Sequence, residues 1–237
     1  MRKPEKDVIL KPRKLKDFVK EQVIYIPLDD SSLPLQSTIK KRALKEKKTI
    51  FGNLYLLDDK IVLYKCLGAP SAVLSLEPLI VSGAREIIVL GFCGSLNKNF
   101  RIMDAVSISK ALSEEGTSRH YFPRKRIFDP APALKAKIEN VLHSSKLAFL
   151  SGSLVSTDAP YRETRHWMKE KQQKGIDVVD MEISAVFALA KFYGIQAAAL
   201  TIISDELWSG VWKEGFRTPE FKEKIKKYFI PFIDKNW

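Results

Sequence analysis

Short apolar runs rich in β-branched residues alternate with helical segments along most of this 237-residue chain. Continuous apolar runs of strand length are typical of strands that are covered on both faces. Strands that alternate with helices predict an α/β fold with a central mixed, mostly parallel β-sheet flanked by helices on both faces. The expected strands are 23–28, 50–57, 61–67, 86–90, 105–109, 147–155, 176–180 and 197–203.

Capping and turn residues place the helices between these runs. Helices are expected over 72–81, from Asp129-Pro130 to about His143, over 182–193 and from Thr218-Pro219 onwards. Asp129 and Thr218 are capping residues followed by a proline that suits the first helical turn, and Gly194 ends the third helix. The run from Gly91 to Ser95, with its two glycines, is expected either to let the backbone approach a ligand or to form a tight turn. No linker or change in composition divides residues 1–237, so we expect one domain.

The composition places the chain among proteins of a reducing compartment. No apolar run approaches the ~18 residues of a membrane helix, and the N-terminus is charged from its first residues. We therefore expect a cytoplasmic protein without a membrane partner. Cys66 and Cys93 each end an apolar strand, which suits small buried side chains, although a disulfide between them stays an alternative.

The formal net charge is +12, from 40 basic and 28 acidic residues. The basic residues cluster at 11–20, 40–48 and 222–227, a pattern that raises the question of a nucleic-acid partner. No helix-turn-helix, zinc-finger spacing or aromatic-basic RNA motif accompanies them, and apolar residues at helical spacing interrupt the last cluster. We do not expect nucleic acid as a partner. A basic surface also attracts phosphate and phosphorylated metabolites.

Acidic residues stand where two buried strands end. The first is in the run Val179-Asp180-Met181-Glu182, and the second is in Ser204-Asp205. Ligands of α/β sheets bind at the carboxyl ends of the strands, so both runs predict a substrate site. Structural alternatives are a helix-dipole role for Glu182 and a turn or helix cap at Ser204-Asp205.

An ordered set of motifs links the chain to a known family. Between about Gly68 and Leu207 the chain resembles the nucleoside phosphorylase superfamily, in its uridine phosphorylase-like and hexameric purine phosphorylase branch. The resemblance implies a pentosyltransferase that acts on a nucleoside with inorganic phosphate as co-substrate, needs no metal or other cofactor, and assembles into homo-oligomers, dimers or hexamers. The motifs are Gly91-x-Cys93-Gly94-Ser95-Leu96, Glu115 to Tyr121, Ser156 to Tyr161, Asp180-Met181-Glu182-x-x-Ala185 and Ser204-Asp205.

The resemblance assigns roles to three of these residues. Cleavage of a ribosyl C–N bond builds positive charge on the sugar, so a nearby carboxylate helps most at the transition state. By resemblance, Glu182 binds the 2′ and 3′ hydroxyls of the ribose and Met181 packs against the sugar. Asp205 resembles the catalytic aspartate that supplies a proton or hydrogen bond to N7 of a purine, which favours purines over pyrimidines.

The residues expected to contact the base match the family pattern less closely than Glu182 and Asp205 do. The resemblance suggests Tyr161, Arg162 and Arg165 of the loop after Asp158, together with Ser204. The loop lacks the glutamine with which the uridine-type branch reads uracil, and Pro160 stands where the family has a phenylalanine that stacks on the base.

The phosphate ligands depart furthest from the family pattern. The family's early Gly-Asp-Pro-x-Arg loop is missing from the basic segment 1–20, where Lys11 and Arg13 are the nearest equivalents. Gly91, Ser95 and Lys65 are further candidate phosphate contacts. Val89 replaces an arginine, and Phe92 replaces a phosphate-binding hydroxyl. Three hypotheses therefore stay open: a nucleoside phosphorylase, a hydrolytic nucleosidase, or a nucleoside-binding protein that has lost activity.

Overall fold

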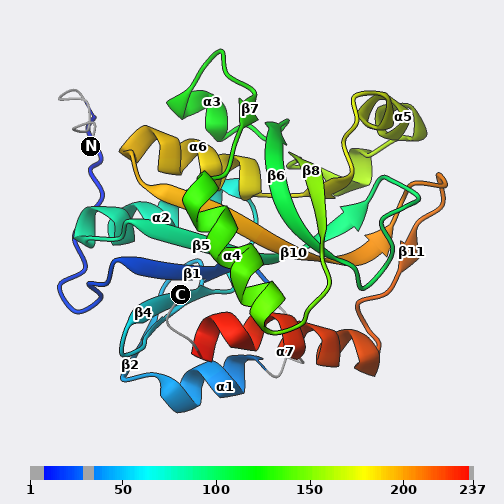
Figure 1. Ribbon diagram of the computed structural model, residues 1–237. Coiled ribbons are helices and arrows are strands. Elements are labelled where there is room, and N and C mark those ends of the chain that lie inside the picture. Colours follow the sequence, from blue (N-terminus) through cyan, green and yellow to red (C-terminus); the bar gives the residue numbers. More distant parts are fainter. Residues whose placement is uncertain (1–7, 29–34, 235–237) are drawn as a thin grey trace.

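A mixed β-sheet forms the centre of the computed structural model, which describes residues 8–28 and 35–234 (Figure 1). Its strands are β1 (Gln22–Ile26), β2 (Lys45–Lys48), β3 (Asn53–Leu56), β4 (Lys60–Tyr64), β5 (Glu86–Ser95), β6 (Ala105–Ser113), β7 (Ile127–Phe128), β8 (Leu150–Ser156), β9 (Val178–Asp180), β10 (Gln196–Glu206) and β11 (Lys213–Glu214). The helices are α1 (Leu35–Arg42), α2 (Ala69–Ser82), α3 (Ser118–Tyr121), α4 (Pro132–Ser144), α5 (Arg165–Gln173), α6 (Ile183–Tyr193) and α7 (Pro219–Asp234), with a 3₁₀ turn η1 (Pro160–Arg162).

Parallel pairing dominates the middle of the sheet. Strand β5 lies between β1 and β10 and is parallel to both, so that Ile88 is paired with Ile24 on one side and Ala198 on the other. Beyond β10 the order is β6, β8 and β9, and β9 returns to pair antiparallel with the end of β5. These strands therefore close into a ring. On the other side of β1, strands β4, β3 and β2 extend the sheet.

Both faces of the sheet are buried under helices. Val23 and Tyr25 of β1 join an apolar cluster with α2 and α6, whereas Ile24 and Ile26 join a second cluster with α1, α4 and α7. Figure 1 shows α7 and α1 together beneath the sheet, and α4 crossing the face near β10. Burial on both faces explains why the strands are continuous apolar runs.

The α/β architecture expected from the sequence is confirmed, with several local differences. Of the two alternatives for residues 91–95, the tight turn is wrong, because β5 continues through Ser95 and pairs there with β10 and β9. Helix α4 begins at Pro132 rather than Pro130, and no side chain caps it. Gly194 ends α6 in the left-handed conformation as predicted, and the Thr218 hydroxyl accepts a hydrogen bond from the Phe221 amide at the start of α7.

Two further features of the fold bear on the sequence-based expectations. Cys66 and Cys93 are both buried and form no disulfide. Among the helices within residues 8–28 and 35–234, none is long and apolar enough to cross a membrane.

Candidate active site

A cavity of about 240 Å³ opens where β5, β9 and β10 end and α6 begins. The cavity is lined by the acidic residues at the ends of β9 and β10, which lie about twenty-five positions apart in the sequence. Its walls are formed by Leu28, Leu67, Phe92, Cys93, Gly94, Pro160, Glu163, Val179, Asp180, Met181, Glu182, Ser204, Asp205 and Leu207.

Gly94 brings the two acidic ends together. It pairs with Asp205 of β10 on one side and with Val179 of β9 on the other, after a register shift at Ser204. A Cβ atom on Gly94 would lie 2.6 Å from Leu207 Cδ1 and 3.1 Å from Asp205 Oδ2. Only glycine lets the strands and the Asp205 carboxyl approach this closely.

Glu182 occupies the head of α6 with its carboxyl group buried. Its side chain is 3% exposed, and its Oε2 atom accepts a hydrogen bond of 3.1 Å from the Gly68 amide. Burial raises the pKa of Glu182 well above its usual value, and the negative charge of Asp180 raises it further. Met181 beside it is half-buried on the cavity wall.

Asp180 fixes the backbone that carries Glu182. Its Oδ2 atom accepts hydrogen bonds from the amides of Glu182 (3.2 Å) and Ile183 (2.8 Å), so it caps the N-terminus of α6. Its other carboxylate oxygen accepts from the Ser156 hydroxyl, which in turn accepts from the Ser184 amide at 2.9 Å. The position of Glu182 therefore depends on a hydrogen-bond network that joins β8, β9 and α6.

Asp205 and Glu163 form the other acidic side of the cavity. Asp205 accepts hydrogen bonds from the Ser204 hydroxyl (2.6 Å) and from the Trp212 indole (2.9 Å). Burial and then the negative charge of Asp205 raise the pKa of Glu163 to about 7. Sequence reasoning missed Glu163, although an acidic residue in the polar loop 156–165 was a signal that could have found it.

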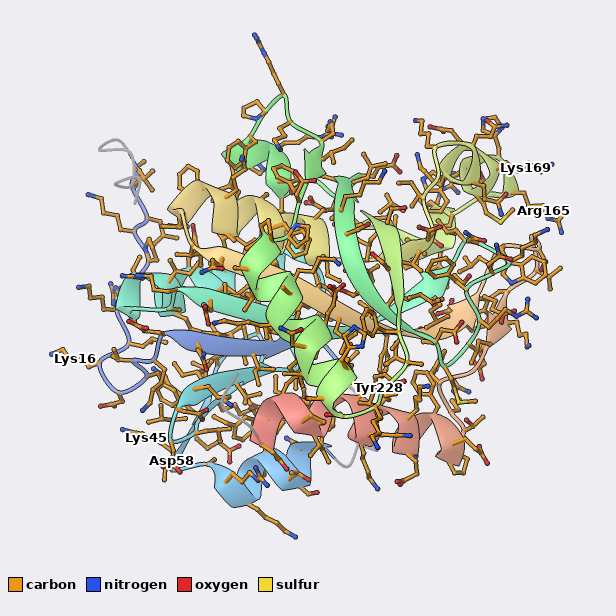
Figure 2. The ribbon with its side chains drawn as sticks, viewed as in Figure 1. Lys16, Lys45, Asp58, Arg165, Lys169 and Tyr228 are labelled. Atoms are coloured by element: carbon orange, nitrogen blue, oxygen red, sulfur yellow. The ribbon has the colours of Figure 1, made fainter. Side chains whose placement is uncertain are left out.

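None of the three loop residues that were expected to contact the base lines the cavity. Tyr161, Arg162 and Arg165 do not line the cavity, and all three side chains are exposed. Arg165 lies at the periphery of the molecule (Figure 2), and its Nε atom donates to the Gly210 carbonyl at 3.2 Å. The turn η1 directs Pro160 and Glu163 to the cavity instead, and of the predicted base residues only Ser204 lines it.

The expected phosphate residues also lie outside the cavity. Lys11 and Arg13 are exposed in the N-terminal segment, which is anchored at α2 by a hydrogen bond from the Leu15 amide to Ser82. Gly91 and Ser95 belong to β5, and the Ser95 hydroxyl donates to the Asn97 carbonyl at 2.8 Å. Residues 1–7 of the basic segment are outside the described ranges.

An aromatic side chain stands where the family resemblance expects a phosphate ligand. Phe92 lines the cavity and packs edge-to-face against Phe221, with ring centroids 5.0 Å apart. Val89, at the position of the family's arginine, is fully buried. Among the described residues that line the cavity there is no lysine, arginine or histidine.

Comparisons with known proteins identify the family of the chain. The family model of the phosphorylase superfamily matches residues 25–230, so the chain belongs to this superfamily. A guanosine phosphorylase of Halorubrum lacusprofundi is 29% identical over 202 residues, which cover 84% of this chain and 79% of that protein. A DeoD-type purine nucleoside phosphorylase of Bacillus cytotoxicus is 30% identical over 149 residues, 61% of this chain and, at 62%, less than two thirds of that enzyme.

Two solved structures share the fold. The purine nucleoside phosphorylase of Toxoplasma gondii, determined in complex with immucillin-H, superposes with a TM-score of 0.75 at 21% identity, covering 98% of this chain and 96% of that one. A mutant futalosine hydrolase of Helicobacter pylori superposes with a TM-score of 0.70 at 16% identity, covering 92% of this chain and 99% of that one. The same fold therefore occurs in enzymes named as a phosphorylase and as a hydrolase.

The close approach at Gly94 makes a first prediction. Gly94→Ala forces Leu207, Val179 or the Asp205 carboxyl to move, and overpacking of this kind typically costs about 1–3 kcal/mol of unfolding free energy. Denaturant unfolding measures this cost. Gly116→Ala is the control, because its Cβ would meet Asp158 Oδ2 at an ordinary 3.6 Å. Equal stabilities of the two variants would contradict the packing described at Gly94.

Burial of Glu182 makes a second prediction. An unfolded glutamate loses its proton near pH ~4.3, whereas the raised pKa of Glu182 keeps the proton in the folded protein to higher pH. Stability is therefore lost as pH rises between the two values. Glu182→Gln does not titrate, so its melting temperature relative to wild type should rise with pH, by about 2–4 °C per kcal/mol. A difference that is constant from about pH 5 to about pH 8 would argue against a raised pKa.

Proposed function

We propose that this protein cleaves the N-glycosidic bond of purine nucleosides with inorganic phosphate, giving the free base and ribose 1-phosphate. The observation that carries the proposal is the single cavity shared by Glu182 and Asp205. Membership of the phosphorylase superfamily supports it, as do the printed names of the guanosine and purine nucleoside phosphorylases to which the chain is similar.

Glu182 is proposed to bind the ribose. A carboxylate can accept hydrogen bonds from two neighbouring hydroxyls, and its negative charge stabilises the cationic sugar that forms as the base departs. The Gly68 amide already holds Glu182 Oε2, which limits rotation of the carboxyl group. Burial raises the pKa of Glu182. Hydroxyl donors and positive charge beside the carboxyl group act in the opposite direction, so binding of the sugar favours loss of the Glu182 proton. Met181 is proposed to pack against the sugar.

Asp205 is proposed to face the base, together with Ser204 and Glu163. The Asp205 carboxyl lies beside Gly94, and Ser204 holds one of its oxygens. Purines present ring nitrogens and hydrogen-bonding groups at both edges, which suits an acidic wall of two carboxyl groups. The Phe92 ring and the aliphatic side chains of Val179 and Leu207 supply apolar contact area for a heterocycle.

Hydrolysis of the same bond is the second candidate, and Phe92 favours it. Phosphate binding requires cations, amide groups or hydroxyls around the anion, and an apolar ring offers none of these. Since no lysine, arginine or histidine is among the described residues of the cavity wall, water would suffice as the nucleophile there. Phosphorolysis instead requires that amide or hydroxyl groups of the wall, such as those of Gly94 and Ser204, hold the phosphate, or that a cation reaches it from outside this set of residues, such as one from a neighbouring subunit.

A homo-oligomer is proposed as the working form. An apolar hollow beside the β2–β3 turn is lined by Leu15, Ile50, Phe51 and Leu74, and Ile50 is 92% exposed. Apolar surface gathered in one place is typical of subunit contacts. A second copy of the chain would cover it.

The nucleophile is tested by product analysis. Wild-type protein is incubated with guanosine or uridine, with and without phosphate, and the sugar product is identified. Formation of ribose 1-phosphate only when phosphate is present is the expected result. Free ribose at an equal rate in phosphate-free buffer would instead establish the hydrolase. Binding of guanosine without any turnover would contradict both activities.

The site assignment is tested by substitution. Glu182→Ala should lower kcat/KM by about 10²–10³-fold, because an interaction that strengthens in the transition state is lost. Asp205→Ala should reduce turnover of guanosine more than that of uridine. Glu170→Ala on α5 is the control, since Glu170 pairs with Lys171 and Lys174 and lies outside the cavity. An unchanged kcat/KM in Glu182→Ala would remove Glu182 from the site.

The subunit contact is tested by Ile50→Lys. Light scattering should give wild type at two or more times the chain mass of 27.0 kDa, and the variant at a lower mass because a buried lysine is costly. Ile127→Lys is the control, as Ile127 is also exposed (49%) but lies on β7, outside the apolar hollow. A monomeric wild-type protein would refute the oligomer.

A further inference from the structure

The motif from Glu115 to Tyr121 contains a buried acidic residue that the cavity does not use. None of residues 115–121 lines the cavity, yet Glu115 is fully buried, with 0% of its surface exposed. A charged carboxyl group at such a position costs folding free energy unless hydrogen bonds replace those it made with water. The hydrogen-bond partners of Glu115 therefore indicate which part of the molecule it supports.

Four hydrogen bonds hold the Glu115 carboxyl group. Its Oε1 atom accepts from the hydroxyls of Ser113 (2.7 Å), Ser118 and Ser184 (2.9 Å), and its Oε2 atom accepts from the Ser118 amide at 3.0 Å. The Ser113 hydroxyl also lies 3.4 Å from the Glu115 carbonyl oxygen. Burial disfavours the charge, but the four hydrogen bonds outweigh burial and lower the pKa of Glu115. Glu115 is therefore an ionised acceptor at neutral pH.

One of these bonds reaches the helix that begins beside Glu182. Ser184 lies in the first turn of α6, two residues after Glu182. Its hydroxyl is bonded to Glu115, and its amide donates at 2.9 Å to the Ser156 hydroxyl, which donates to Asp180. Asp180 in turn accepts from the Glu182 amide at 3.2 Å. A chain of hydrogen bonds thus links Glu115, outside the cavity, to the residue proposed to bind the ribose.

We propose that Glu115 is a positioning residue, which holds the first turn of α6 so that the Glu182 carboxyl group meets the ribose hydroxyls. This inference rests on the proposed function and adds to it a residue behind the site. Its basis is geometric, because Glu115 holds the Ser184 side chain while Asp180 holds the backbone amides that precede it. The first turn is therefore fixed at both its backbone and its side chain.

The negative charge of Glu115 strengthens this support. Hydrogen bonds to an ionised acceptor are stronger than those between neutral groups. The charge also has a cost, because burial and then the negative charge of Glu115 raise the pKa of Asp180 to about 6. Two like charges behind one helix end are unfavourable for folding alone. Support of a functional side chain by its neighbours explains why both are present.

Glu115→Gln keeps the size of the side chain and removes its charge. The amide nitrogen of glutamine accepts no hydrogen bond, so a donor beside it loses its acceptor. We expect kcat/KM for guanosine to fall by about 10–10²-fold, as for a displaced catalytic contact. The ratio of kcat/KM for guanosine to that for 2′-deoxyguanosine should also fall, because only guanosine offers Glu182 both hydroxyls. A smaller folded fraction would lower both values equally and leave this ratio unchanged.

A double-mutant cycle tests whether Glu115 acts through Glu182. The variant that combines Glu115→Gln with Glu182→Ala should be no slower than Glu182→Ala alone, because the group that Glu115 positions is absent. Glu77→Gln is the matched control. Glu77 accepts hydrogen bonds from the hydroxyls of Tyr121 (2.9 Å) and Tyr193 (3.0 Å), and so holds the other end of α6. Any loss in Glu77→Gln should multiply with that of Glu182→Ala and leave the substrate ratio unchanged.

Two results would overturn the inference. They are losses that multiply in the Glu115 cycle, and an unchanged substrate ratio in a folded Glu115→Gln. If melting curves show that Glu115→Gln does not fold, Ser184→Ala takes its place in the cycle. That variant removes the link to α6 and leaves the bonds from Ser113 and Ser118 to Glu115 in place.

The cycle is also measured on guanosine affinity, so that it does not depend on turnover. Independent losses of affinity in a protein that binds guanosine would refute the positioning role alone. A wild-type protein that neither cleaves nor binds guanosine would refute the proposed function, and this inference with it.

Discussion

The pairing of Gly94 with two strands at once is the constraint on which the site depends. Parallel pairing with β10 brings Asp205 to one side of Gly94, and antiparallel pairing with β9 brings Val179 and the following acidic run to the other. A larger residue would separate the two sides. Because β5 pairs with both strands, the two acidic motifs, which are distant in the sequence, lie on opposite sides of one small cavity.

Concentration of carboxyl groups in an apolar cavity costs stability. Asp180, Glu182 and Glu163 all lie where burial disfavours their charge, and the pKa of each is raised. Hydrogen bonds to the first turn of α6 offset part of this cost at Asp180. Such an arrangement contributes little to folding, but it suits a reaction whose transition state carries positive charge on the sugar.

The sequence predicted the site residues that strand pairing positions, but not those that a loop positions. Met181 and Glu182 follow directly on β9, and Ser204 and Asp205 lie within the last residues of β10, so strand pairing fixes where they lie, and all four line the cavity. Tyr161, Arg162 and Arg165 belong to a loop, where a single 3₁₀ turn decides which side chains face inward. The spacing of residues in the sequence does not determine that choice, and Glu163 was missed for this reason.

The elements of the fold that the sequence predicted are likewise those with a strong local apolar pattern. Strands buried on both faces were found from their apolar runs, whereas α1 buries only Leu35 and Ile39, β2 buries none of its residues, and neither has a strong apolar pattern. The continuation of β5 through two glycines was missed because its partners β9 and β10 are distant in sequence. Closure of the strands into a ring is a tertiary property for the same reason.

A crystal structure of Asp205→Asn soaked with guanosine would test the central claim most directly. The account predicts a nucleoside in the cavity, with both ribose hydroxyls on the Glu182 carboxyl and the base between residue 205 and Glu163. Guanosine bound elsewhere, or bound in the cavity with its ribose away from Glu182, would contradict it.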